Sequence, residues 1–128
     1  MQRCLELAEL AEREGESPVG SVVVKDGIII GEAYEKSRQL KDITRHAEVL
    51  ALLDACKNKG DISGSILYSN MEPCILCSYA IRYYKIAEVV FMKHSGELGG
   101  TSVPFNLLTA DNLASWIAPP LVTVYQEE

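Results

Sequence analysis

Long apolar segments are missing from this chain of 128 residues, and no apolar run approaches the roughly 20 residues that a membrane-spanning helix requires. The N-terminal segment MQRCLELAELAEREGE is charged throughout and lacks the apolar centre of a signal peptide. These two absences predict a cytoplasmic protein with no membrane partner.

Positive charge is also scarce, with 12 Lys and Arg residues against 18 Asp and Glu residues and a net charge of −6. Nucleic-acid-binding proteins usually present a basic face, because phosphate neutralisation supplies much of their affinity. Four basic residues lie between residues 36 and 45, but Glu35 and Asp42 dilute them, and a solvated loop is the simpler interpretation. The composition therefore favours a small neutral substrate over a nucleic acid.

The chain has only four cysteines, and a disulfide framework is not expected in a cytoplasmic protein. Cys4 and Cys56 lie on expected helices and are interpreted as small core residues. Cys74 and Cys77 form a CxxC pair. The sequence has no second CxxC pair, which a zinc ribbon would need.

Repeats, low-complexity segments and linkers are absent, which predicts a single domain over residues 1–128. Hydrophobic periodicity and turn signals predict a hairpin over 19–34 that turns at Lys25-Asp26-Gly27. They also predict helices at 2–14, 45–60, 72–85 and 106–117, and strands at 65–70, 87–92 and 121–126. This order predicts an α/β fold, a three-layer α/β/α sandwich around a five-stranded mixed sheet.

Cys74 and Cys77 are expected in the first turn of the helix that begins near Glu72, on one helical face. Unpaired N–H groups and the helix dipole favour negative charge there, and the thiolate is the form of cysteine that binds metal. His46 is expected to begin the preceding helix, and helix N-termini gather at the carboxyl ends of the strands in such folds. The sequence therefore predicts one Zn²⁺ ion per chain, held by His46, Cys74 and Cys77.

Three ligands leave one position open, as in catalytic zinc sites, whereas structural sites usually have four protein ligands. His94 is a poor fourth ligand because it lies beyond the next expected strand, and the other two cysteines are remote. Glu48 lies two residues after His46 and is suited to exchange protons with a zinc-held water. Alone, His46 could cap a helix and CxxC could be redox-active, so the prediction rests on their combination.

The segments HAE at 46–48 and EPCILC at 72–77 match the H-x-E…P-C-x-x-C signature of zinc deaminases. Together with SPVGSVVVKDG, HAEVLAL, LYSNMEPCILCSYAI and EVVF, they make the chain resemble the cytidine deaminase-like superfamily. The most similar branch contains tRNA adenosine, guanine and cytosine deaminases. The resemblance implies that His46, Cys74 and Cys77 bind Zn²⁺ and that Glu48 transfers protons while a ring amino group leaves as ammonia.

The resemblance also implies that the backbone near Glu72 and the hairpin around Pro18 and Val19 line the substrate pocket. Glu35 stands where members of this branch usually have an Asn that contacts the substrate. An ionised Glu only accepts hydrogen bonds, so Glu35 would select a substrate that presents N–H groups. The alternative is that Glu35 faces water.

These features predict a hydrolase that acts on C–N bonds of cyclic amidines in purine or pyrimidine metabolism. The favoured substrate is a free nucleobase or nucleoside of the guanine, cytosine or adenine type. A tRNA adenosine deaminase is one alternative, although segment 93–102 lacks the charged residues usual in those enzymes. A non-catalytic, zinc-stabilised subunit is the other, and Glu48 argues against it.

The helix expected at 72–85 is apolar on more than one face, which predicts a homodimer or, alternatively, a fully internal helix. Phe105 and Trp116 are expected to pack in the core, with stacking on a base as the alternative. The sequence leaves open whether residues 104–128 cover the pocket of their own chain or that of a neighbour.

Overall fold

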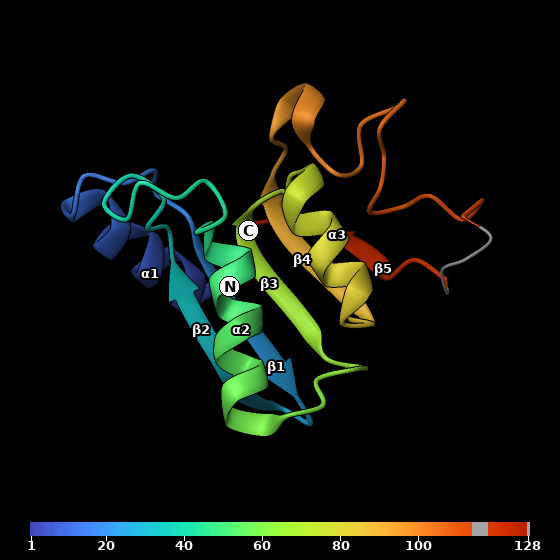
Figure 1. The fold of residues 1–128 in the computed structure, drawn as a ribbon, viewed down its shortest axis with the longest axis horizontal. Coiled ribbons are helices and arrows are strands. Elements are labelled where there is room, and N and C mark those ends of the chain that lie inside the picture. Colours follow the sequence, from blue (N-terminus) through green and yellow to red (C-terminus); the bar gives the residue numbers. More distant parts are fainter. Residues whose placement is uncertain (114–117, 128) are drawn as a thin grey trace.

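The computed structural model describes residues 1–113 and 118–127, and a five-stranded sheet in the order β2-β1-β3-β4-β5 forms its centre (Figure 1). Strand β1 pairs antiparallel with β2 and β3, whereas β3, β4 and β5 run parallel, so the predicted mixed sheet is confirmed. The strands are β1 (Gly20–Lys25), β2 (Ile28–Tyr34), β3 (Ile66–Met71), β4 (Glu88–Lys93) and β5 (Leu121–Val124).

In the described part of the chain, three α-helices cover the two faces of this sheet, α1 (Gln2–Arg13), α2 (Ala47–Lys59) and α3 (Ile75–Tyr83), and a short 3-10 helix, η1 (Gly96–Leu98), follows β4. Figure 1 shows α2 and α3 beside each other on one face, with α1 on the other. Neighbouring residues of β1 alternate accordingly, because Val22 packs with Cys4 of α1 while Val23 packs with Leu52 of α2 and Ile81 of α3. The predicted three-layer α/β/α sandwich is confirmed.

The longest of these helices has 13 residues. None of the helices within residues 1–113 and 118–127 is long and apolar enough to cross a membrane. The cytoplasmic location stays a prediction.

The hairpin turns where the sequence predicts it, and it positions α2 against the sheet. Asp26 and Gly27 have φ angles of 53° and 77°, so both central residues of the turn adopt the left-handed conformation that hairpins favour. Gly31 lies on β2, where a Cβ atom would approach the backbone nitrogen of Ala55 to 2.5 Å. The absence of a side chain at Gly31 therefore lets α2 pack directly on the strand.

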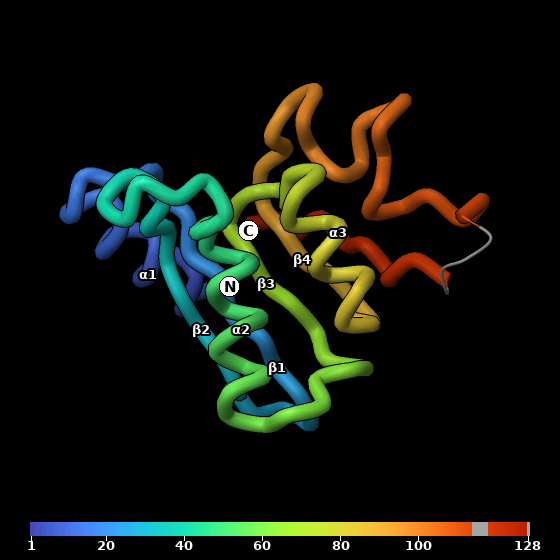
Figure 2. The backbone as a smooth tube through the Cα atoms, in the orientation of Figure 1, coloured from blue at the N-terminus to red at the C-terminus, as the bar shows by residue number. Residues whose placement is uncertain are grey.

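The helix predicted at 106–117 is wrong over residues 106–113, which form turns and irregular backbone (Figure 2). Arg82 of α3 explains the difference, because its Nη1 donates to the carbonyl oxygens of Leu107 and Ala110. The backbone N–H of Leu108 also donates to Gly100 instead of to a helical partner. Tertiary contacts thus engage backbone groups that a longer helix would need, and the segment keeps only a single turn in which the N–H of Ala110 donates to Asn106.

The core position expected for Phe105 is also wrong, because this side chain is 66% exposed. The prediction for Trp116 falls outside the described residues. Cys4 is fully buried, as expected, and Cys56 packs against the main core.

Candidate metal centre and active site

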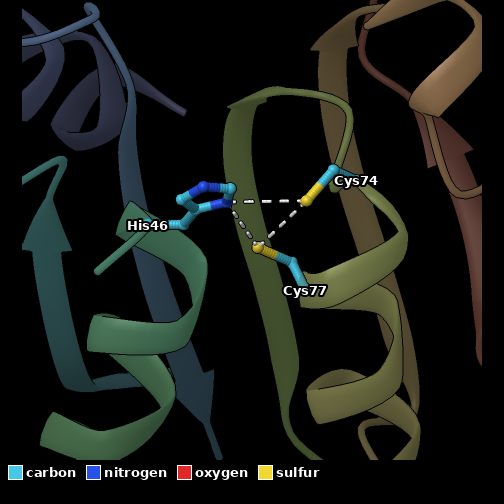
Figure 3. A group of neighbouring side chains, drawn as sticks. All are labelled: His46, Cys74 and Cys77. Carbon is cyan, nitrogen blue, oxygen red and sulfur yellow. Dashed lines mark hydrogen bonds between the residues drawn. The ribbon is translucent and has the colours of Figure 1, made fainter. Parts of the chain in front are cut away.

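The N-termini of α2 and α3 bring the three expected metal ligands together (Figure 3). His46 is the N-cap residue of α2, Cys74 is the N-cap residue of α3, and Cys77 lies in the first turn of α3. The Nδ1 atom of His46 is 3.5 Å from each cysteine Sγ atom, and the two Sγ atoms are 3.8 Å apart. The structure therefore places one nitrogen and two sulfur donors around a common centre.

These separations fit a tetrahedral zinc ion. Zinc binds sulfur at about 2.3 Å and nitrogen at about 2.0–2.1 Å, which puts tetrahedral S–S and S–N pairs about 3.8 Å and about 3.5 Å apart. The observed distances of 3.8 Å and 3.5 Å agree with both values. Among the described residues no fourth His, Cys, Asp or Glu joins the group, so a tetrahedral ion would keep one open position.

Cys74, the less buried of the two cysteines, has a thiol whose pKa is lowered. Hydrogen bonding with Cys77, and then with His46, lowers the pKa of the Cys74 thiol to about 4. The lowered pKa favours the thiolate of Cys74, which is the form that binds zinc, whereas the hydrogen bond with Cys74 and burial raise the pKa of Cys77.

Glu48 lies in the first turn of α2, is only 4% exposed, and lines a cavity of about 330 Å³ together with His46 and Cys74. Burial raises the pKa of this carboxyl to about 8, and a divalent cation in the cavity would oppose that shift. A buried carboxylate at this place can accept a proton and release it again.

The same cavity contains part of the set predicted to bind substrate. Val19, Glu35 and Glu72 line it, whereas Pro18 does not, and the carbonyl of Pro18 accepts a hydrogen bond from Asn70. Sequence reasoning missed three further lining residues, because nothing in their local pattern distinguishes them. The complete lining is Ser17, Val19, Glu35, His46, Glu48, Met71, Glu72, Cys74 and Ser95.

The carboxylate of Glu72 is used to hold the loop that follows β4. It accepts hydrogen bonds from the backbone N–H groups of Ser95 and Thr101, at 2.9 Å and 2.8 Å, and from the hydroxyl of Thr101. Although burial opposes it, these bonds lower the pKa of Glu72. Gly99 passes so close that a Cβ atom there would lie 2.3 Å from the carboxylate. The Glu72 side chain thus fixes one wall of the cavity.

Glu35 does not face water, so that alternative is wrong. Its side chain is 8% exposed, and its two carboxylate oxygens accept hydrogen bonds from the backbone N–H of Ala47 and the hydroxyl of Ser37.

A fourth buried carboxylate, Glu16, was missed by sequence reasoning. It accepts the backbone N–H groups of Arg38 and Gln39, at 3.0 Å and 2.7 Å. In the sequence it resembles the exposed glutamates of the preceding helix, so its pattern carries no signal.

Comparison with known proteins places this site in a family. Residues 1–93 match the family model described as the cytidine and deoxycytidylate deaminase zinc-binding region. The chain belongs to this deaminase family. The family match and the His46, Cys74 and Cys77 cluster together make it a zinc-dependent hydrolytic deaminase. The alternative of a non-catalytic subunit finds no support in these results.

One curated relative and two solved structures show which deaminases this chain is similar to. The chain is 40% identical over 119 residues to the tRNA-specific adenosine deaminase of Aquifex aeolicus, covering 89% of this chain and 79% of the relative. A solved structure from a study of A-to-I editing by tRNA:A34 deaminases at the wobble position superposes with a TM-score of 0.88 at 28% identity. The match covers 98% of this chain and 95% of that chain. The guanine deaminase of Bacillus subtilis gives a TM-score of 0.68 at 36% identity, and the match covers 73% of this chain and 61% of that chain.

Proposed function

We propose that this deaminase converts adenosine to inosine in tRNA. The observation that carries the proposal is the extent of the match to the tRNA:A34 deaminase structure, which spans nearly all of both chains. The Bacillus subtilis guanine deaminase has a lower TM-score, 0.68, and the Aquifex aeolicus relative that is 40% identical to this chain is also named a tRNA-specific adenosine deaminase. The comparisons therefore favour the tRNA alternative over the free nucleobase that the charge balance suggested.

The acidic net charge is compatible with an RNA substrate because the charge is unevenly distributed. The loop between β2 and α2 begins at Glu35, which lines the cavity, and its exposed residues include Arg38 and Lys41. Between residues 36 and 45 the chain has four basic residues and one acidic residue, although the whole chain carries a net charge of −6. The phosphate groups of an RNA bound at the cavity would interact with the positive charge of this loop, and the net charge of the whole chain would matter less.

The proposed roles of the site residues follow from their positions. His46, Cys74 and Cys77 hold one Zn²⁺ ion, which supplies a water molecule of lowered pKa when it is bound. Glu48 accepts a proton from the attacking water and delivers it to the departing amino group. Water thereby supplies the oxygen of inosine, the C–N bond breaks, and the nitrogen leaves as ammonia.

The cavity is proposed to take the base alone, with the sugar and neighbouring nucleotides outside. Val19, Glu35 and the backbone of Glu72 would bound the base, in keeping with their positions in the lining. Enzymes that act on a base in a nucleic acid take that base out of its stack into such a pocket.

A direct comparison of substrates tests the proposal. We expect kcat/KM for an anticodon stem-loop with adenosine at the wobble position to exceed that for free guanine by at least about 100-fold. Ammonia release measures both, and the same stem-loop with guanosine at the wobble position is the control. Turnover of guanine without turnover of the adenosine stem-loop would contradict the proposal and favour a free-base deaminase.

We also propose that the deaminase is a homodimer that pairs through the surface between α2 and α3. An apolar groove of about 250 Å³ lies there, lined by Val49, Leu52, Leu53, Tyr79, Ala80, Tyr83 and Tyr84. Tyr79 and Tyr83 stack on each other yet remain 54% and 63% exposed. Burying such apolar surface stabilises association.

Light scattering on the purified protein tests this arrangement. We expect a mass of twice 14.1 kDa for the wild type. Tyr83→Glu should shift the protein toward the monomer, because it places a charge in the apolar groove. Tyr125→Glu is the matched control, since Tyr125 is also exposed but lies outside this groove. A monomeric wild type, or equal effects of both changes, would argue against pairing through this groove.

A further inference from the structure

The N-terminus of α2 carries both His46 and Glu48, yet the side chain of its N-cap residue does not cap the helix. The first backbone N–H groups of a helix have no partner within the helix, and the N-cap side chain usually provides one. Here the N-cap residue is His46, which makes no side-chain capping bond, and its Nδ1 atom faces the cysteines. The cap must therefore come from another residue.

Glu35 supplies it from the end of strand β2. Its Oε1 atom accepts a hydrogen bond of 3.0 Å from the backbone N–H of Ala47, the first residue of α2. Its Oε2 atom accepts a 2.7 Å bond from the hydroxyl of Ser37, which orients the carboxylate. The backbone N–H of Glu35 donates to the carbonyl of Val19 at 3.1 Å, so the residue is held at both ends.

We propose that Glu35 is a positioning residue, whose carboxylate caps α2 and thereby holds His46 in the orientation that faces the metal. A carboxylate suits this place, because a negative charge is favourable at a helix N-terminus and strengthens the hydrogen bond. Residues that orient metal ligands in this way commonly alter metal affinity when they are changed. The inference rests on the metal site and does not depend on tRNA as substrate.

Two of the other three buried glutamates provide a contrast. Glu16 and Glu72 also accept backbone N–H groups, but those groups belong to the loops at 38–39 and 95–101. Neither carboxylate bonds to α2 in the described hydrogen-bond network. Glu16→Ala is therefore a matched control, because it removes a buried carboxylate with two backbone partners without uncapping the helix.

Cobalt-loaded protein tests the inference without any substrate. Co²⁺ replaces zinc at such sites, and its absorption bands report the arrangement of the ligands. We expect Glu35→Ala to weaken Co²⁺ binding by about 10–100-fold, measured by competition with a chelator, and to shift the absorption bands. Glu35→Gln should keep most of the affinity and the wild-type bands, because its amide oxygen can still accept the N–H of Ala47.

Each other outcome has a defined meaning. Unchanged Co²⁺ affinity and bands in Glu35→Ala would overturn the inference, and a raised KM alone would then make Glu35 a substrate contact. A loss of Co²⁺ affinity in Glu35→Gln as large as that in Glu35→Ala would also overturn the inference, because the lost cap would then not explain the weaker binding. Glu16→Ala should leave the bands unchanged, and matching shifts there would indicate a general effect of lost buried carboxylates.

A milder variant keeps the test decisive if Glu35→Ala does not fold. Ser37→Ala removes only the bond that orients the carboxylate, so we expect a smaller change in the same direction. In that case, wild-type affinity and bands in Ser37→Ala would overturn the inference.

Discussion

Replacing Glu48 with Gln is expected to lower the rate of ammonia release by about 10²–10⁴-fold, the usual contribution of general acid–base catalysis, while the protein keeps its zinc. Gln has nearly the same shape as Glu but cannot take a proton from water and return it. Glu48 is buried, lines the cavity beside His46 and Cys74, and does not belong to the cluster of metal donors. Steady-state assays with the adenosine stem-loop, together with elemental analysis for zinc, measure both parts of the result.

Glu16→Gln is the control for this experiment, because Glu16 is equally buried but does not line the cavity. We expect it to keep most of the activity. Full turnover in Glu48→Gln would remove Glu48 from the mechanism. Loss of zinc together with activity would instead assign Glu48 to the metal site.

Cys74→Ser is expected to abolish both zinc binding and turnover. A serine hydroxyl stays protonated at neutral pH, whereas the pKa of Cys74 is lowered to about 4 and its thiolate is available to the metal. The remaining donors, His46 and Cys77, make an incomplete set. We expect zinc affinity to fall by more than about 100-fold, the upper end of changes seen when only supporting residues are replaced.

Cys56→Ser provides the matched control, since Cys56 is partly buried on α2 but outside the metal cluster. It should retain stoichiometric zinc and activity. Circular dichroism distinguishes a lost ion from a lost fold, because Cys74→Ser should keep its helical signal. Zinc content and turnover that persist in Cys74→Ser would show that the metal is held elsewhere.

Much of the metal centre could be predicted because its ligands and the proposed proton-transferring residue lie in two short sequence motifs. The spacing of His46 and Glu48, and that of Cys74 and Cys77, placed each pair at the N-terminus of a helix. The hairpin at Asp26 and Gly27 was equally local, since the turn needs residues that adopt positive φ angles. Such features depend on residues that are close in sequence, so they can be predicted without knowledge of the fold.

Other features depend on partners that are distant in sequence. The apolar pattern at 106–113 favours a helix, but Arg82 binds carbonyl oxygens of this segment and holds it in turns. Likewise, Glu16 looks like a surface glutamate until the fold brings backbone N–H groups to it. Glu35 was predicted to contact substrate, but its hydrogen bond from the N–H of Ala47 also depends on the fold. The net charge does not decide the substrate, because a sum over the chain does not say where its charges lie.

The most direct test of a hydrolytic deaminase is to run the reaction in water enriched in oxygen-18. We would digest the treated adenosine stem-loop to nucleosides and weigh the product by mass spectrometry. Incorporation of one solvent oxygen in the new inosine, with one ammonia released per inosine, is the predicted result. A product without solvent oxygen, or inosine formed without ammonia, would contradict the account.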